Sequence, residues 1–194
     1  AFQSRQAAYL SKLKEALERI VTTPASVHPL LEGDESDRVL NFHSNLKILP
    51  DGKIEVTETI RIYNGDGGML SENDDIKRGI LRDFPTKYLH QKGYWVHTGF
   101  NLKSVLLDGK EENYTTQSLD NGTRVQIGNA DVVLPKGIYT YVLKYETNRQ
   151  LIFHPDRDEL YWNVNGNGWG FRFDTVAATL EFPSQAEIGA QQCY

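Results

Sequence analysis

Two runs in which apolar and polar residues alternate lie on either side of Pro50-Asp51-Gly52. Successive side chains of a strand point to opposite faces, so each run predicts a strand with one buried face. In the second run Glu58 takes one of the alternating positions, together with Ile54, Val56, Ile60 and Ile62. An Asp-Gly pair between two such runs is a strong hairpin signal. The pattern therefore predicts a β-hairpin over residues 38–62.

Short runs rich in aromatic and β-branched residues continue along the chain, and turn residues such as Asn121-Gly122 separate them. The predicted strands cover residues 38–48, 54–62, 79–84, 94–107, 113–116, 123–127, 138–145, 158–165 and 171–182. Many short strands between turns are typical of sandwiches and barrels. The chain is therefore expected to be all-β, an antiparallel β-sandwich of about nine strands with Greek-key or immunoglobulin-like connections.

The first part of the chain has a different period. Leu10, Leu13, Leu17 and Ile20 recur at spacings of three and four, which predicts an amphipathic α-helix over residues 3–21. Prolines and an acidic run over residues 24–37 indicate a linker. The predicted organisation is a helix and linker over residues 1–37 and a sandwich domain over residues 38–194.

Composition limits the classes of partner. The chain has 194 residues and a formal net charge of −5, which argues against nucleic acid, since polynucleotide affinity rests on clustered Lys and Arg. No stretch approaches the 18 consecutive apolar residues of a transmembrane helix. The single cysteine, Cys193, has no partner for a disulfide within the chain. The uncapped sequence before Tyr194 leads us to expect that the natural polypeptide continues, with the sandwich domain truncated at its C-terminal end.

Motifs of catalysis and of metal binding are missing from the sequence. There is no GxSxG elbow, no HExxH and no EF-hand spacing, so we expect no cofactor and no catalytic residue. Acidic loops do supply oxygen ligands of the kind that calcium takes. The weak calcium candidates are Asp66, Asp74, Asp75 and Asp156. Loop carboxylates could also serve as the acid and base of a glycosidase, but their separation cannot be obtained from sequence.

Aromatic and amide side chains are densest over residues 158–169. Aromatic rings provide contact area and amides provide orientation, so this segment could bind a sugar ring or a peptide. The candidate ligand-binding residues are Tyr161, Trp162, Asn163, Asn165, Asn167 and Trp169. The alternative is structural: Leu160 and Trp162 point into the core, and the Asn-Gly pairs form turns.

Charged pairs occur in two predicted strands, Arg82-Asp83 and Asp158-Glu159. Because neighbouring strand residues face opposite sides, one member of each pair could point inward, where a charge needs a partner. We therefore predict a buried bridge between Arg82 and an acidic residue of the second pair.

Three segments resemble a known family: the hairpin over residues 40–62, the run Gly79-Ile80-Leu81-Arg82-Asp83-Phe84-Pro85, and the aromatic segment over residues 158–169. They resemble the N-terminal domain of predicted bacterial membrane proteins of the DUF2207 family, and the resemblance covers about residues 38–183. It implies a signal peptide, an extracytoplasmic β-rich domain and transmembrane helices that follow it. The predicted helix over residues 3–21 and the long loop over residues 64–77 depart from the family pattern.

The family is named for having no known function, so the resemblance transfers no catalytic residue. It does imply that Cys193 could find a partner in the C-terminal part. Three functions remain open: a non-catalytic module that binds a protein or glycan on the extracytoplasmic face of the cell membrane, a carbohydrate-active or other hydrolase that uses loop carboxylates, and a structural spacer. The hydrolase predicts a concave pocket with at least two carboxylates. The spacer predicts no pocket and an exposed apolar or strand-edge patch.

Overall fold

The computed structural model describes residues 36–65, 76–89, 93–184 and 186–192, which form fourteen strands and no helix. Among these residues, accordingly, no helix is long and apolar enough to cross a membrane. The predicted helix over residues 3–21, most of the predicted linker, and Cys193 lie outside the described residues.

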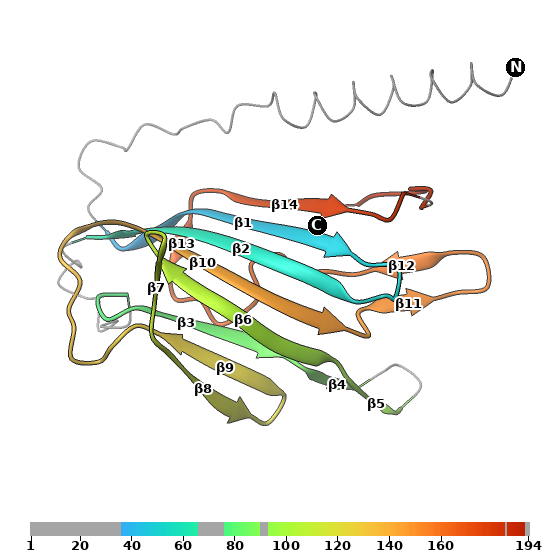
Figure 1. Ribbon diagram of the computed structural model, residues 1–194, viewed down its shortest axis with the longest axis horizontal. Coiled ribbons are helices and arrows are strands. Elements are labelled where there is room, and N and C mark those ends of the chain that lie inside the picture. Colours follow the sequence, from blue (N-terminus) through green and yellow to red (C-terminus); the bar gives the residue numbers. More distant parts are fainter. Residues whose placement is uncertain (1–35, 66–75, 90–92, 185, 193–194) are drawn as a thin grey trace, which may run out of the picture. The chain divides into compact units, whose positions relative to one another are not determined.

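The largest sheet, whose strands lie side by side in Figure 1, has seven strands and contributes most of the core residues. Its hydrogen-bonded order is β13, β1, β2, β10, β6, β7, and β14 pairs with β1. The strands of this sheet are β1 (Arg38–Ile48), β2 (Ile54–Asn64), β6 (Gly99–Leu107), β7 (Lys110–Glu111), β10 (Gly137–Asn148), β13 (Arg172–Phe173) and β14 (Val176–Glu181).

The predicted hairpin is confirmed as β1 and β2, which pair from Ile48 opposite Ile54 to Arg38 opposite Tyr63. Side chains of β2 at every second position are buried, as the alternation requires. A register shift between Val39 and Asn41 changes the phase at the start of β1. Val39 therefore takes the buried position that the alternation assigned to Leu40, which is only half-buried.

The expected antiparallel pairing holds for β1, β2, β10, β6 and β7, but β13 and β14 run parallel to β1. Antiparallel neighbours can be joined by a tight turn, whereas parallel ones need a long crossover. Here the chain between the parallel neighbours β1 and β13 runs through residues 49–171, which contain β2 to β12. The sheet is therefore mixed, and the prediction of a purely antiparallel arrangement is wrong.

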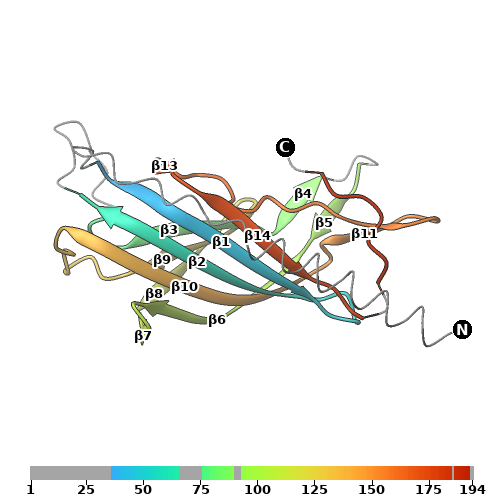
Figure 2. The same ribbon diagram turned by 90° about the horizontal axis from the view of Figure 1, so that it is seen from above.

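A three-stranded sheet lies against one face of the larger sheet (Figures 1 and 2). Its antiparallel strands are β3 (Ile80–Pro85), β9 (Gly122–Ile127) and β8 (Tyr114–Leu119). Ile80 and Phe84 of β3 and Val125 and Ile127 of β9 are buried in the same core as β1, β2 and β10. The core thus lies between two facing sheets, which confirms the all-β class. The Greek-key or immunoglobulin-like sandwich itself stays a prediction.

Two hairpins complete the described structure. They are β4 (Lys87–Leu89) with β5 (Trp95–His97), and β11 (Leu151–Phe153) with β12 (Asp158–Leu160). The sequence predicted about nine strands because two- and three-residue strands carry too little alternation to be recognised. The predicted strand over residues 171–182 is divided into β13 and β14, and the one over residues 158–165 ends at Leu160.

Candidate functional site

A charged pair lies in the core between the two sheets. Arg82 of β3 is 3% exposed and Glu58 of β2 is 1% exposed. The guanidinium donates from Nε to Oε2 of Glu58 at 2.9 Å and from Nη2 to Oε1 at 2.6 Å. Two parallel charge-assisted hydrogen bonds of this kind are strong and geometrically specific. Because an unpaired charge costs several kcal/mol in the interior, about 3–5 when one partner is removed, the pair holds β3 against β2 in one position.

Aromatic rings surround the Arg82 guanidinium. Its Cζ atom lies 4.9 Å from the ring centroid of Phe84, 5.3 Å from that of Phe42 and 5.6 Å from that of Trp169. Cations are attracted to the faces of such rings. Burial by itself would lower the pKa of Arg82, but the charge and the hydrogen bonds of Glu58 outweigh it and raise that pKa. Arg82 is therefore a permanent cation in the core.

Tyr145 of β10 joins the charged pair. Its hydroxyl donates to Oε1 of Glu58 at 2.9 Å, and its side chain is 4% exposed. Burial, and then the negative charge of Glu58, raise the pKa of Tyr145 well above its ordinary value. Arg82, Glu58 and Tyr145 thus form one buried network, which connects β3, β2 and β10.

The same network holds the aromatic segment that follows β12. The backbone carbonyl of Asn165 accepts from Nη1 of Arg82 at 3.1 Å and from Nε1 of Trp169 at 2.8 Å. Gly166 has φ +70°, and a Cβ atom there would lie 2.7 Å from Nη1 of Arg82. Glycine is needed at this position both for its backbone conformation and for the close approach of the arginine.

The candidate ligand-binding residues do not form one surface. Tyr161 is 69% exposed, and Asn163 and Asn167 are exposed and joined by a hydrogen bond from Nδ2 to Oδ1 of 3.0 Å. Trp162 and Trp169 instead pack against the core, and Asn165 is half-buried. The ring of Trp169 meets the rings of Phe42 and Phe173 edge-on, with centroids 6.2 and 5.3 Å apart. Only Tyr161, Asn163 and Asn167 are left as an exposed aromatic and amide group.

The predicted buried bridge from Arg82 to an acidic residue is confirmed, but the predicted partner is wrong, because the bridge goes to Glu58 and not to Asp158 or Glu159. Asp158 and Glu159 are exposed in the β11–β12 hairpin, and Glu159 contacts Nε2 of His154 at 3.1 Å.

Asp83 points to the opposite side of β3 from Arg82 and is bound by Arg124 of the neighbouring β9. The Arg124 guanidinium donates from Nε and Nη2 to the two carboxylate oxygens at 2.7 and 2.8 Å. These hydrogen bonds lower the pKa of Asp83.

The calcium candidates receive no support from the described residues. Asp66, Asp74 and Asp75 lie outside them, and Asp156 is exposed and pairs with Arg157 at 3.1 Å. Throughout the described part of the chain, no group of three or more His, Cys, Asp and Glu side chains is placed to hold a metal ion.

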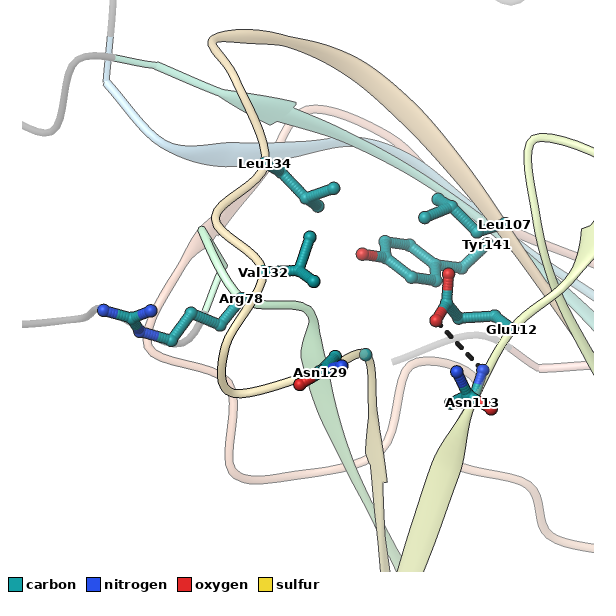
Figure 3. A pocket seen from close by; sticks show the side chains of 9 residues that line it. Arg78, Leu107, Glu112, Asn113, Asn129, Val132, Leu134 and Tyr141 are labelled. Carbon is teal, nitrogen blue, oxygen red and sulfur yellow. Dashed lines mark hydrogen bonds between the residues drawn. The ribbon is translucent and has the colours of Figure 1, made fainter.

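A cavity of about 240 Å³ opens between β6, β10 and the connection from β9 to β10 (Figure 3). Leu107, Val132 and Leu134 give it apolar walls, whereas Glu112, Asn113 and Asn129 line its polar part. The carboxylate of Glu112 accepts from the backbone N–H of Asn113 at 2.9 Å. The cavity therefore combines an apolar interior with hydrogen-bonding groups.

Tyr141 of β10 reaches into this cavity, and Figure 3 shows its hydroxyl directed toward Val132 and Leu134. The side chain is 0% exposed, and the hydroxyl has no hydrogen-bond partner among the described residues. Burial, and then the charge of Glu112, raise the pKa of Tyr141. A buried hydroxyl without a partner costs about 1–3 kcal/mol, so Tyr141 is the polar group of this cavity that a ligand could satisfy.

Sequence reasoning missed both Glu58 and Tyr141 as site residues. For Glu58 there was a signal, because an acidic residue occupies an apolar position of the β2 alternation. For Tyr141 there was none, because Tyr139, Tyr141 and Tyr145 share one face and only the structure shows which hydroxyl is bonded.

Tyr141 and Tyr145 provide a matched pair for a stability test. Tyr145→Phe removes one of the two hydrogen bonds that Oε1 of buried Glu58 accepts, and should lower the free energy of unfolding by about 1–3 kcal/mol. Tyr141→Phe removes a hydroxyl that has no partner within the described ranges of the chain, and should leave stability unchanged or raise it. Urea unfolding followed by circular dichroism measures both. Equal losses in the two variants would show that the Tyr141 hydroxyl is satisfied in solution.

The fold and the cavity define a class of protein: an all-β domain built from several sheets, with a small cavity between β6, β10 and the connection from β9 to β10. The chain belongs to the family described as Predicted membrane protein (DUF2207) N-terminal domain, which matches residues 38–193. This confirms the family that the sequence resembles. The chain is 26% identical over 145 residues to Uncharacterized protein YciQ of Escherichia coli (strain K12), a match that covers 75% of this chain and 22% of YciQ. It spans about a fifth of the length of that relative.

Solved structures with some similarity include native leukotriene A4 hydrolase from Saccharomyces cerevisiae, with a TM-score of 0.39 and 16% identity over 58% of this chain and 15% of the hydrolase. An M1 zinc metallopeptidase from Deinococcus radiodurans has a TM-score of 0.38 and 12% identity over 61% of this chain and 22% of the peptidase. Similarities of this size carry no argument about the activity of this chain.

Proposed function

We propose that this chain is the non-catalytic interaction module of a membrane-anchored bacterial protein, that it lies on the extracytoplasmic face of the membrane, and that it binds a partner protein through the cavity at Tyr141. The hydroxyl of Tyr141 inside that cavity, which has no hydrogen-bond partner in the part of the chain that the structure describes, carries the proposal. The family description as a predicted membrane protein supports the membrane location. The anchor is then formed by transmembrane segments that follow the domain in the full-length protein.

The size of the cavity favours part of a macromolecule over a whole cofactor. Its volume is about 240 Å³, whereas pockets for drug-sized ligands measure about 300–1,000 Å³. A dry cavity of about 150 Å³ is already large enough for a benzene molecule. One large side chain of a partner protein therefore fits the available space.

The chemistry of the cavity describes that side chain. Leu107, Val132 and Leu134 suit an apolar stem, and the hydroxyl of Tyr141 needs an acceptor deep in the cavity. Glu112, half-buried at the wall, can accept a hydrogen bond from the partner. A partner residue with an apolar stem and a hydrogen-bonding tip satisfies all three requirements.

The alternative functions find less support. Of the two described cavities, the larger one has one carboxylate among its lining residues, that of Glu112. The other, of about 190 Å³, lies between the start of β3 and residues 168–171, and no Asp or Glu lines it. Neither provides the pair of carboxylates that the hydrolase hypothesis requires. A spacer needs no cavity, so the one at Tyr141 favours binding. A glycan ligand would instead bind at the exposed group of Tyr161, Asn163 and Asn167.

Selection from a random peptide library tests the proposal. The chain is the bait, and a Leu134→Trp variant, whose larger side chain fills the cavity, is the counter-selection. We expect the enriched peptides to share one anchor residue and to bind the variant about tenfold more weakly, which corresponds to about 1.4 kcal/mol. Tyr141→Phe should weaken the binding of the same peptides while it leaves the fold intact.

The control is Tyr161→Ala, which changes an exposed side chain of the aromatic segment and should bind the peptides like the unaltered chain. Peptides that bind the Leu134→Trp variant equally well would contradict the cavity as the binding site. A glycan-array signal that Tyr161→Ala abolishes, without enriched peptides, would instead support a glycan ligand.

A further inference from the structure

The β4–β5 hairpin is short, and yet it exposes several large apolar side chains. Tyr88, Leu89, Tyr94 and Trp95 are all exposed, and Trp95 reaches 57%. None of the four belongs to the core or to the partly buried residues that pack against it. A two-stranded hairpin gains little stability by itself, so these side chains contribute little to folding.

The base of the hairpin is nevertheless held firmly. The backbone N–H groups of Thr86 and Lys87 donate to the carbonyl of Asn121 at 2.9 and 3.0 Å, and the N–H of Thr98 donates to the carbonyl of Thr86 at 2.9 Å. These hydrogen bonds fix the base of the hairpin to the turn between β8 and β9, and Figure 1 shows β4 and β5 at the end of β3 and the start of β6.

Charge distinguishes this part of the chain from the rest. Residues 84–107 contain three lysines, two histidines and no Asp or Glu, in a chain whose net charge is −5. Within the hairpin, Nζ of Lys87 lies 4.7 Å from the ring centroid of Trp95. The exposed apolar group is thus combined with positive charge, on a protein that is acidic elsewhere.

Exposed tryptophan and tyrosine side chains beside lysine match the chemistry of a membrane surface. Trp and Tyr prefer the headgroup level of a bilayer, and lysines near anionic lipids add attraction that salt screens. The β11–β12 hairpin also exposes an aromatic residue, Phe153, but it carries three acidic residues, Asp156, Asp158 and Glu159, and one arginine, Arg157. The charges therefore make the β4–β5 hairpin, and not the β11–β12 hairpin, the candidate for contact with anionic lipid.

We propose that the β4–β5 hairpin docks onto an anionic lipid bilayer, with Tyr94 and Trp95 at the headgroup level and Lys87 beside the lipid phosphates. This surface is separate from the cavity at Tyr141, and the proposal rests on the membrane location of the family. A weak contact is enough for this purpose, because a domain linked to a membrane protein meets the bilayer at high effective concentration.

Tryptophan fluorescence of the chain provides the test. Of its three tryptophans, Trp162 and Trp169 pack against the core, so Trp95 reports contact with lipid. Vesicles of phosphatidylcholine with phosphatidylglycerol should shift the emission to the blue, and brominated lipid should quench it. We expect pure phosphatidylcholine to produce at least about fivefold less binding, and high salt to weaken the binding to the anionic vesicles.

Variants assign the effect to the hairpin in vesicle sedimentation, which needs no Trp95 signal. Tyr94→Ser with Trp95→Ser should abolish binding, and Lys87→Gln should reduce it about fivefold. The matched controls, Tyr114→Ser of β8 and Lys110→Gln of β7, change exposed residues elsewhere and should bind like the unaltered chain. The proposal is overturned if the unaltered chain ignores anionic vesicles, if the double serine variant still binds them, or if the hairpin mediates self-association instead. Peptide binding at the cavity is measured without lipid, so either proposal can fail alone.

Discussion

Replacement of Arg82 by methionine is expected to lower the free energy of unfolding by about 3–5 kcal/mol, because it leaves the charge of Glu58 in the core without its partner. Glu58 is 1% exposed, so solvent cannot take the place of the guanidinium. The same change removes the donor that binds the carbonyl of Asn165, and so releases part of the aromatic segment. Chemical unfolding monitored by circular dichroism measures the loss. An unchanged melting temperature would contradict the role of the pair.

A double variant separates the buried charge from the lost packing. Glu58→Gln in the Arg82→Met background removes the uncompensated charge and keeps an oxygen that can accept from Tyr145. It should recover part of the lost stability, about 1–3 kcal/mol. If the double variant is no more stable than Arg82→Met alone, the cost comes from packing around Arg82, where Phe42, Phe84 and Trp169 lie.

Trp169→Ala should destabilise the chain by about 3–5 kcal/mol, the range for removal of a large aromatic side chain from a packed site. Trp169 is held by edge-on contacts with Phe42 and Phe173 and by its hydrogen bond to the carbonyl of Asn165. Thermal unfolding measures the change. The sequence placed this residue among the candidate ligand contacts, so the result also decides between a role in packing and a role in binding.

The matched control for Trp169 is Tyr161→Ala in the same segment. Tyr161 is 69% exposed, so its removal should change stability by no more than about 0.5 kcal/mol. Similar stability of the two variants would contradict the packing of Trp169 on the core.

The parts of the fold that sequence predicts well are those where the alternation is long. β1, β2 and β10 have eleven or twelve residues each, and their buried faces follow the apolar residues. The one phase error, at Leu40, comes from a β-bulge, which adds a residue to one strand and leaves no fixed mark in the sequence. The parallel strands β13 and β14 were missed because pairing depends on distant segments, which local periodicity does not report.

The candidate site was less predictable, for a related reason. The sequence showed that Arg82 in a strand would need a partner, but it could not show that Glu58, 24 positions earlier, is the residue opposite. Likewise the composition of residues 158–169 is the same whether Trp162 and Trp169 face solvent or core. The structure shows that side chains of this segment alternate: Tyr161 and Asn163 are exposed, whereas Trp162 and Val164 are partly buried. This strand-like pattern continues beyond the end of β12.

The parallel pairing of β14 with β1 has a mechanical consequence. The two strands are in register from Phe42 opposite Val176 to Lys47 opposite Glu181, so the start of β1 and the end of β14 lie at opposite ends of the ladder. Tension applied at Arg38 and at Glu181 would slide one strand along the other and load all hydrogen bonds of the ladder together. We expect a domain built in this way to resist stretching along its strands better than a hairpin, whose bonds open one after another.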